Sequence, residues 1–99
     1  MTFAVAEVRV NIDSLVIRED LDSKGRRYLP KTKIPFQGLV YSEYPNGQVE
    51  FEGPLEIGLQ HDTWVWWYPT GEKKSEITFS NHLKHGHSRS YFESGNLRE

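Results

Sequence analysis

The sequence predicts an all-β fold, an elongated and mostly antiparallel sheet of stacked β-hairpins built from degenerate 24-residue repeats. Three observations predict it. A Tyr-Pro-Asn-Gly turn sequence returns twice in altered form, and its glycine recurs every 24 residues, at Gly47, Gly71 and Gly95. Apolar and polar residues alternate on both sides of these turns, and no segment has a convincing helical period. A fixed period of roughly 20 to 50 residues is typical of repeat arrays.

We expect one domain over residues 1–99, with N-terminal strands and a connector in 1–34 and the repeats in 35–99. In the first part, Val8, Val10 and Ile12 alternate with polar residues and predict a strand. Residues 20–27 form a polar turn centred on Gly25, and residues 26–29 are the expected return strand. Residues 30–35 are expected to be an extended connector, because prolines at both ends disfavour a helix. If the chain has a short helix, this N-terminal third is the place for it.

The residues that follow each turn predict the inward face of the sheet. After the first turn, Val49, Phe51 and Leu55 share one face while their neighbours are polar. After the second turn, Ile77 and Phe79 take the same place. Asn-Gly between two such runs indicates a hairpin, since both residue types tolerate positive φ.

The aromatic run before the second turn divides between the two faces. Alternation sends Trp64, Trp66 and Tyr68 to one face, and Val65 and Trp67 to the other. A sheet of this size needs large side chains in its core, so we expect most of the tryptophans to be buried. The remaining aromatic residues of this run are expected to be exposed.

Composition narrows the class of protein. The 99 residues contain no cysteine, which excludes disulfides and thiolate chemistry. The N-terminal residues lack the features of a signal peptide, and no segment approaches the roughly 20 apolar residues of a membrane helix. We therefore expect a cytoplasmic protein that binds no membrane.

The charges are distributed unevenly, although the net charge is only −2. Residues 34–72 contain six acidic residues and no lysine or arginine. An acidic segment that also holds tryptophan and tyrosine predicts a docking surface for a basic protein, because charge speeds association and these aromatics are frequent binding hot spots. The predicted partner-binding residues are Glu43, Glu50, Glu52, Glu56, Asp62, Trp64, Trp66, Trp67, Tyr68 and Glu72.

Nucleic acid is not the expected partner. The acidic segment would repel phosphates. The basic residues of the N-terminal turn are few and carry one interleaved aromatic residue, so we interpret them as a solvated turn. They are Lys24, Arg26, Arg27, Lys31 and Lys33.

No constellation of residues predicts an enzyme. His82, His85 and His87 have a spacing at which imidazoles can hold zinc, with His61 or a carboxylate as a further ligand. However, His61 and His85 occupy one equivalent repeat position, and residues 83–86 are expected to form a turn. The serines lack a paired histidine and acid, and the glycines lack a phosphate-binding pattern. We predict no catalytic residues, no metal and no cofactor.

The unit Tyr-x-Asn-Gly, followed by Glu and then by Gly-Leu-x-x-Gly-x-Trp, resembles the MORN repeat in its bacterial variant form. Its approach, with Ile-Pro-Phe-Gln-Gly at residues 34–38 after Tyr28, is similar to that of YwqK-type antitoxins. The resemblance covers roughly residues 28–98. The sequence departs from the pattern at Asp62, where the family has glycine, at residues 81–82, which read Asn-His, and at Ser88, where it has tryptophan.

The resemblance implies a sheet of β-hairpins and a protein that neutralises a cognate bacterial toxin domain, such as a basic nuclease or deaminase, by blocking its active site. It carries over no catalytic residue. The alternative is a structural or scaffolding MORN module that mediates protein–protein association, including self-association through open sheet edges.

Overall fold

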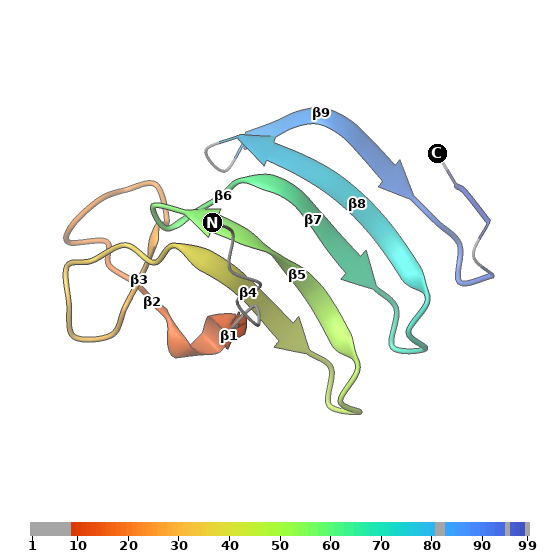
Figure 1. Cartoon of the computed structure of the whole chain (residues 1–99), viewed down its shortest axis with the longest axis horizontal. Helices are drawn as coiled ribbons and strands as arrows, with labels where there is room; N and C mark the ends of the chain where they lie inside the picture. The colour runs from red at the N-terminus through yellow and green to blue at the C-terminus, as the bar shows by residue number, and fades with distance from the viewer. Residues whose placement is uncertain (1–8, 81–82, 95, 99) are drawn as a thin grey trace, which may run out of the picture.

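The computed structural model describes residues 9–80, 83–94 and 96–98, and in these ranges the chain is almost entirely β-structure (Figure 1). The elements in chain order are β1 (Arg9–Asn11), the 3-10 helix η1 (Ile12–Ser14), β2 (Val16–Ile17), β3 (Arg27–Tyr28), β4 (Gly38–Glu43), β5 (Val49–Glu56), β6 (Leu59–Gln60), β7 (Asp62–Trp67), β8 (Lys73–Ser80) and β9 (Leu83–Ser90).

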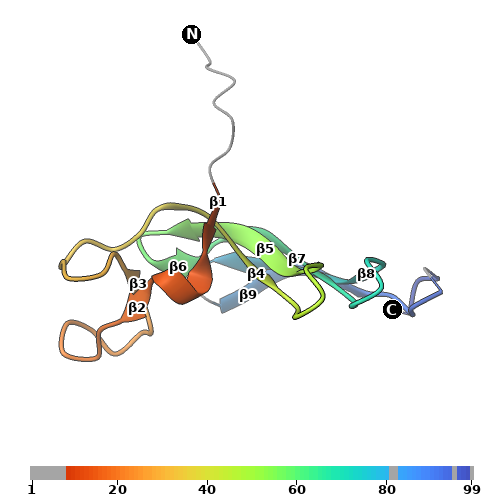
Figure 2. The same ribbon diagram turned by 90° about the horizontal axis from the view of Figure 1, so that it is seen from below.

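The main sheet has the order β1-β4-β5-β7-β8-β9, and β6 pairs with β5 beside β7. Every neighbouring pair is antiparallel except β1 and β4, which are parallel. The predicted all-β fold of mostly antiparallel hairpins is therefore confirmed. Seen from below, the repeats form one curved layer, with η1, β2 and β3 to one side of it (Figure 2). The described residues extend over 43 × 36 × 27 Å.

The N-terminal third agrees with the sequence analysis in part. Of the three residues that predicted the first strand, Val10 lies in β1, Ile12 begins η1 instead, and Val8 lies outside the described residues. The strand β3 returns antiparallel to β2, with Ile17 opposite Arg27, as expected. The short helix is η1, where Asn11 accepts a hydrogen bond from the backbone of Asp13. The expectation of an extended connector over residues 30–35 is wrong. This segment turns back on itself, because Lys31 has a φ of 62° and the backbone of Leu29 bonds to that of Ile34.

The hairpin turns predicted at Gly47 and Gly71 form and share one geometry, whereas Gly95 of the third predicted turn lies outside the described residues. The backbone N–H of Gly47 donates to the carbonyl of Tyr44, and Gly71 donates to Tyr68, both at 2.9 Å. Each glycine has positive φ, 89° and 95°. The expected role of Asn46 is corrected, since its own φ is not positive. Its side chain instead accepts a hydrogen bond from the N–H of Gln48, which closes the turn.

A second turn type joins β5 to β6. Ile57 and Gly58 have φ values of 49° and 75°, the pattern of a two-residue hairpin turn with both central residues left-handed. The N-terminal segment holds this turn from outside. Arg27 donates its N–H to the carbonyl of Gly58 (2.9 Å), and Gly58 donates to Phe36 (2.8 Å). These contacts explain how β-branched Ile57 is kept in an unfavourable conformation.

One row of residues across the inward face combines large and small side chains. Gly53 lies opposite Val40 on β4, and a Cβ placed on Gly53 would be 2.2 Å from the indole of Trp64. In the next repeat, 24 residues later, Ile77 takes the place of Gly53 and Ser88 that of Trp64. The exchange of a Gly–Trp contact for an Ile–Ser pair keeps the row filled without a clash.

The core joins the N-terminal segment to the repeats. Leu15, Val40, Leu55, Trp64 and Phe79 form one buried cluster. Partly buried apolar residues of both regions pack against it, namely Val10, Ile12, Leu29, Phe36, Phe51, Trp66 and Ile77. The predicted inward positions of Phe51, Leu55, Ile77 and Phe79 are thereby confirmed. The inward position predicted for Val49 is wrong, because the irregular pairing after Ser42 places Val49 beside Glu52 and Trp67 on the other face.

The C-terminal part differs from one expectation. Residues 83–86 were expected to form a turn, but they belong to β9, which pairs with β8 from Leu83 to Ser90. The ladder is irregular there, and Gly86 has a φ of 86°. In the ranges that the structure describes, no helix has the length and hydropathy needed to cross a bilayer.

Candidate functional site

The sheet presents two faces of different chemistry. The inner face carries Phe51, Trp64, Trp66, Ile77 and Phe79, which pack on one another and on the N-terminal segment. The outer face carries a row of paired residues from neighbouring strands: Tyr41, Glu52, Val65, Glu76 and Arg89. The predicted division is confirmed for the three tryptophans, with Trp64 and Trp66 on the inner face and Trp67 on the outer face beside Arg9 and Glu52.

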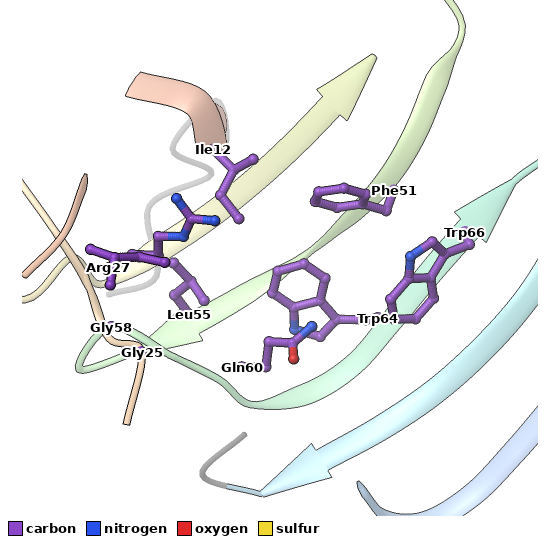
Figure 3. A pocket seen from close by; sticks show the side chains of 10 residues that line it. Ile12, Gly25, Arg27, Phe51, Leu55, Gly58, Gln60, Trp64 and Trp66 are labelled. Carbon is purple, nitrogen blue, oxygen red and sulfur yellow. The ribbon is translucent and has the colours of Figure 1, made fainter. Parts of the chain in front are cut away.

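A pocket of about 380 Å³ lies between the N-terminal segment and the inner face (Figure 3). We call it the inner-face pocket. The N-terminal side contributes Ile12, Ile17, Gly25 and Arg27. The sheet contributes Phe51, Leu55, Gly58, Gln60, Trp64 and Trp66. Its walls are thus mainly apolar and aromatic, with one charged side chain, that of Arg27.

The outer face has a smaller hollow in which charge is already paired. It has a volume of about 330 Å³ and is lined by Arg9, Gln48, Val49, Glu52, Trp67 and Gly71. Arg9 forms an ion pair with Glu52, and its guanidinium lies 4.8 Å from the centre of the Tyr41 ring. The hydrogen bond to Glu52 raises the pKa of Arg9 above its usual value. Sequence analysis missed this pair because 43 residues separate its members.

The same position in each repeat places a charged side chain by an aromatic ring at the turn. Lys74 lies over Tyr68 with its Nζ 5.8 Å from the ring centre, and Arg98 lies 5.7 Å from the centre of the Phe92 ring. In the first repeat the equivalent residue is Glu50. Burial is the main cause that raises the pKa of Tyr44, and the negative charge of Glu50 adds to it. The first repeat therefore differs from the others in the sign of its charge at this position.

The structure distributes the predicted partner-binding residues over several places. Trp64 is 1% exposed and belongs to the core, so its side chain offers no surface to a partner. Trp66 lines the inner-face pocket, and Trp67 lies on the outer face. The hydroxyl of Tyr68 donates to the carbonyl of Tyr91 at 2.7 Å.

The predicted acidic residues also separate. Glu43, Glu50 and Glu72 lie at or next to the hairpin turns, at one end of the sheet. Glu56 and Asp62 lie at the other end, flanking β6. Glu52 lies between these groups in its ion pair with Arg9. The acidic segment of the sequence is thus not one acidic surface in three dimensions.

The histidines provide no metal site in the described part of the chain. His61 contacts Glu56 at 3.1 Å, and no group of three potential metal ligands occurs among the residues described. His82 and the side chains of His85 and His87 lie outside the described residues. The predicted absence of metal and cofactor stays a prediction.

Sequence analysis treated Arg27 as part of a solvated basic turn and did not single out Gln60. The structure separates Arg27 from its basic neighbours, because Arg26 donates to the carbonyl of Ile57 (2.7 Å) while Arg27 lines the inner-face pocket. The sequence did offer one indication that Arg27 faces the sheet. Arg27 lies in the predicted return strand, in which alternate side chains point toward the sheet.

Comparison with known families agrees with the repeat seen in the turns. The model of the MORN repeat variant matches residues 36–56, 63–81 and 84–99, which together are more than half of the chain. Comparisons with curated proteins and with solved structures give no match. The three matched segments coincide with β4–β5, β7–β8 and β9 with the turn after it. The chain therefore belongs to the MORN repeat variant family.

Proposed function

We propose that this protein is an immunity or antitoxin protein that binds a cognate bacterial toxin domain and blocks its active site without chemistry of its own. MORN repeats indicate a module for association with a protein or a membrane. Two further features support a protein partner of basic character, and we propose that the two proteins meet in the cytoplasm. Residues 34–72 carry no lysine or arginine, and half-buried Trp67 lies on the open face of the sheet.

The observation that carries the proposal is the way two turns are tied together. Asn46 donates from its side chain to the carbonyl of Pro69 (2.9 Å), and Tyr44 donates to the carbonyl of Trp67 (2.7 Å). These bonds hold acidic residues of two repeats at one end of the sheet, the end at which Trp67 and its strand partner Lys73 also lie. We call this the turn-end surface, and it consists of Glu43, Glu50, Trp67, Tyr68 and Glu72.

This arrangement suits a toxin with a basic cleft. Glu43 and Glu72 are exposed and Glu50 is half-buried, so their carboxylates can take the place of substrate phosphates. Trp67 adds an aromatic anchor of the kind that dominates many interfaces. Binding would then be fast at low salt and would weaken as salt screens the charges.

The test begins with capture of the partner from the native host at low and high salt, with identification by mass. The triple variant Glu43→Lys, Glu50→Lys, Glu72→Lys is expected to slow association with that partner about tenfold or more at low salt. The control is Asp13→Lys, Glu19→Lys, Glu56→Lys, which changes the net charge equally at exposed positions away from the turn-end surface. Equal effects of the two triple variants would rule out the turn-end surface.

A second candidate function, scaffolding by self-association, has its own supporting observation. The strand β9 pairs only with β8 in the sheet, and its residues 83–89 have no other strand partner in the described part of the chain. An open edge of this kind can pair with another chain. Light scattering tests it: a mass that rises with concentration and persists in high salt, with no toxin recovered, would favour the scaffold.

A further inference from the structure

The inner-face pocket has the size of a small-molecule site. Its volume of about 380 Å³ falls within the range typical of such sites. Its apolar lining comes from two regions far apart in the sequence, the N-terminal segment and the repeats. The pocket is on the opposite face from the outer hollow of Arg9, Glu52 and Trp67, and it takes no part in the proposed turn-end surface.

The aromatic side of the pocket is preformed. Trp64 packs against the backbone of Gly53, and its Nε1–H donates to the carbonyl of Pro54 at 2.9 Å. The ring centres of Phe51, Trp64 and Trp66 are 5.8 to 6.4 Å apart, and the rings are tilted by 34° to 46°. Rings held in this way leave a fixed apolar wall against which a flat molecule can pack at low entropic cost.

Among the residues that the structure describes, Arg27 is the only charged one that lines this pocket. Its backbone is fixed on both sides, since its N–H donates to Gly58 and its carbonyl accepts from Phe36, both at 2.9 Å. In the described ranges, no carboxylate lines the pocket and none of the ion pairs includes Arg27. A half-buried guanidinium in an apolar setting without an acidic partner favours an anionic ligand, and its planar fork matches a carboxylate.

Across the inner-face pocket, the charged group lies at one end and the aromatic rings lie toward the other. Figure 3 shows the guanidinium of Arg27 beside Ile12 and Leu55, with Phe51 and Trp64 between it and Trp66. The side-chain amide of Gln60 lies by Trp64 and supplies one further donor and acceptor. A ligand that fits this order has its charge at one end and its flat body toward the tryptophans.

We propose that the inner-face pocket binds a small molecule with a flat aromatic body and one carboxylate. Arg27 pairs with the carboxylate, and the partly exposed rings of Phe51 and Trp66 pack against the aromatic body, while buried Trp64 packs against both of these rings. Gln60 contacts a polar edge of the ligand. This site is independent of the proposed toxin-binding function, because it involves other residues on another face.

The test uses two probes of equal shape, 2-naphthoate and its neutral amide, 2-naphthamide, with the full chain. Binding is followed by the indole N–H signals in two-dimensional NMR, which separate the tryptophans. Naphthoate is expected to bind about tenfold more tightly than naphthamide, because only the former makes the charged hydrogen bonds to Arg27. The signals of Trp64 and Trp66 are expected to shift, while that of Trp67 stays in place.

Substitutions test which residues are responsible for the difference in affinity between the two probes. Arg27→Gln is expected to lower the affinity for naphthoate to that for naphthamide, and Arg27→Lys to retain part of the difference. Trp66→Leu is expected to weaken both probes. The matched control is Trp67→Leu, which removes a half-buried tryptophan from the opposite face and is expected to change neither affinity. The NMR spectrum of each variant without probe shows whether it remains folded.

Three results would overturn the proposal. These are equal affinity of the wild-type protein for the two probes, an unchanged naphthoate affinity in a folded Arg27→Gln variant, and shifts centred on Trp67. Failure of the turn-end charge variants to affect a protein partner would leave these probe measurements unchanged, so the two proposals fail separately.

Discussion

The hydroxyl of Tyr44 donates a hydrogen bond to the backbone carbonyl of Trp67 at 2.7 Å, across the boundary between two repeats. One period later, Tyr68 donates to the carbonyl of Tyr91 at the same distance. Each tyrosine therefore joins its own turn to the end of the strand that enters the next turn. The residue at this position in the third repeat is Phe92, which has no hydroxyl to donate.

We predict that Tyr44→Phe and Tyr68→Phe each lower the free energy of unfolding by about 1 kcal/mol, since each leaves a half-buried carbonyl without its partner. Urea denaturation measures the change. Tyr41→Phe is the control, because the structure gives the hydroxyl of Tyr41 no hydrogen bond among the described residues, and it is expected to be close to neutral. Equal losses in all three variants would contradict a role for the inter-repeat bond.

Gly53 and Gly47 are predicted to be needed for different reasons. Gly53→Ala would place a Cβ 2.2 Å from the buried indole of Trp64, and we expect a loss of about 3 kcal/mol from overpacking. Gly47→Ala meets nothing within 4 Å, and its cost of about 1 kcal/mol comes from its φ of 89° alone. In a Trp64→Leu background, Gly53→Ala is expected to cost less than it does in the wild-type protein, whereas the cost of Gly47→Ala is expected to be unchanged. Denaturation of the single and double variants tests this.

Ile57 is predicted to be a site where substitution stabilises the protein. It is 53% exposed, and its φ of 49° is unfavourable for a β-branched side chain. Ile57→Asn should raise the free energy of unfolding by about 1 kcal/mol, because Asn tolerates this conformation. Ile57→Val keeps the branched Cβ and serves as the control with no expected gain. A gain of the same size in both variants would point to lost exposed apolar surface instead of relieved backbone strain.

Acid stability is predicted to depend on the contact between Tyr28 and Asp22. The Tyr28 hydroxyl donates to a carboxylate oxygen of Asp22 at 2.5 Å, and this bond is the main cause that lowers the pKa of Asp22. A carboxyl whose pKa is lower in the folded state stabilises the protein above its unfolded pKa, near 3.9, and this stabilisation is lost as the pH falls through the folded value.

The test compares wild type with Tyr28→Phe by urea denaturation over a pH series. The difference in stability between them should be constant at neutral pH and should shrink below about pH 4. Asp20, whose pKa is lowered by its hydrogen bond with Arg18, is present in both proteins, so its titration cancels in this difference. A difference independent of pH would mean that Tyr28 contributes through packing only.

Much of the repeat region could be predicted from the sequence. The 24-residue period located the turns, and alternation assigned Trp64 and Trp66 to one face and Trp67 to the other. The return strand after Gly25 was also found. These features depend on turn chemistry and on the two-residue period of a strand, which act within a few neighbouring residues.

The candidate site was harder to predict. Residues 34–72 form an acidic run in the sequence, but strand pairing inserts Arg9 beside Glu52 and places Lys73 opposite Trp67. A register shift after Trp66 and another after Ser42 further decide which side chains meet at the turn end. The net charge of a sequence segment does not predict the charge of a surface, because strand pairing separates neighbours in the sequence and brings in residues from outside the segment.

By itself, the sequence determined the β-hairpins, their period and the inward apolar face, because local backbone preferences and alternation suffice for these. The tertiary structure alone decided the parallel pairing of β1 with β4, the burial of Trp64 against Gly53, and the pocket in which Arg27 faces Phe51 and Trp66. Each of these joins segments far apart in the chain. These long-range contacts depend on how whole faces of the molecule pack together, and no short segment of the sequence determines that packing.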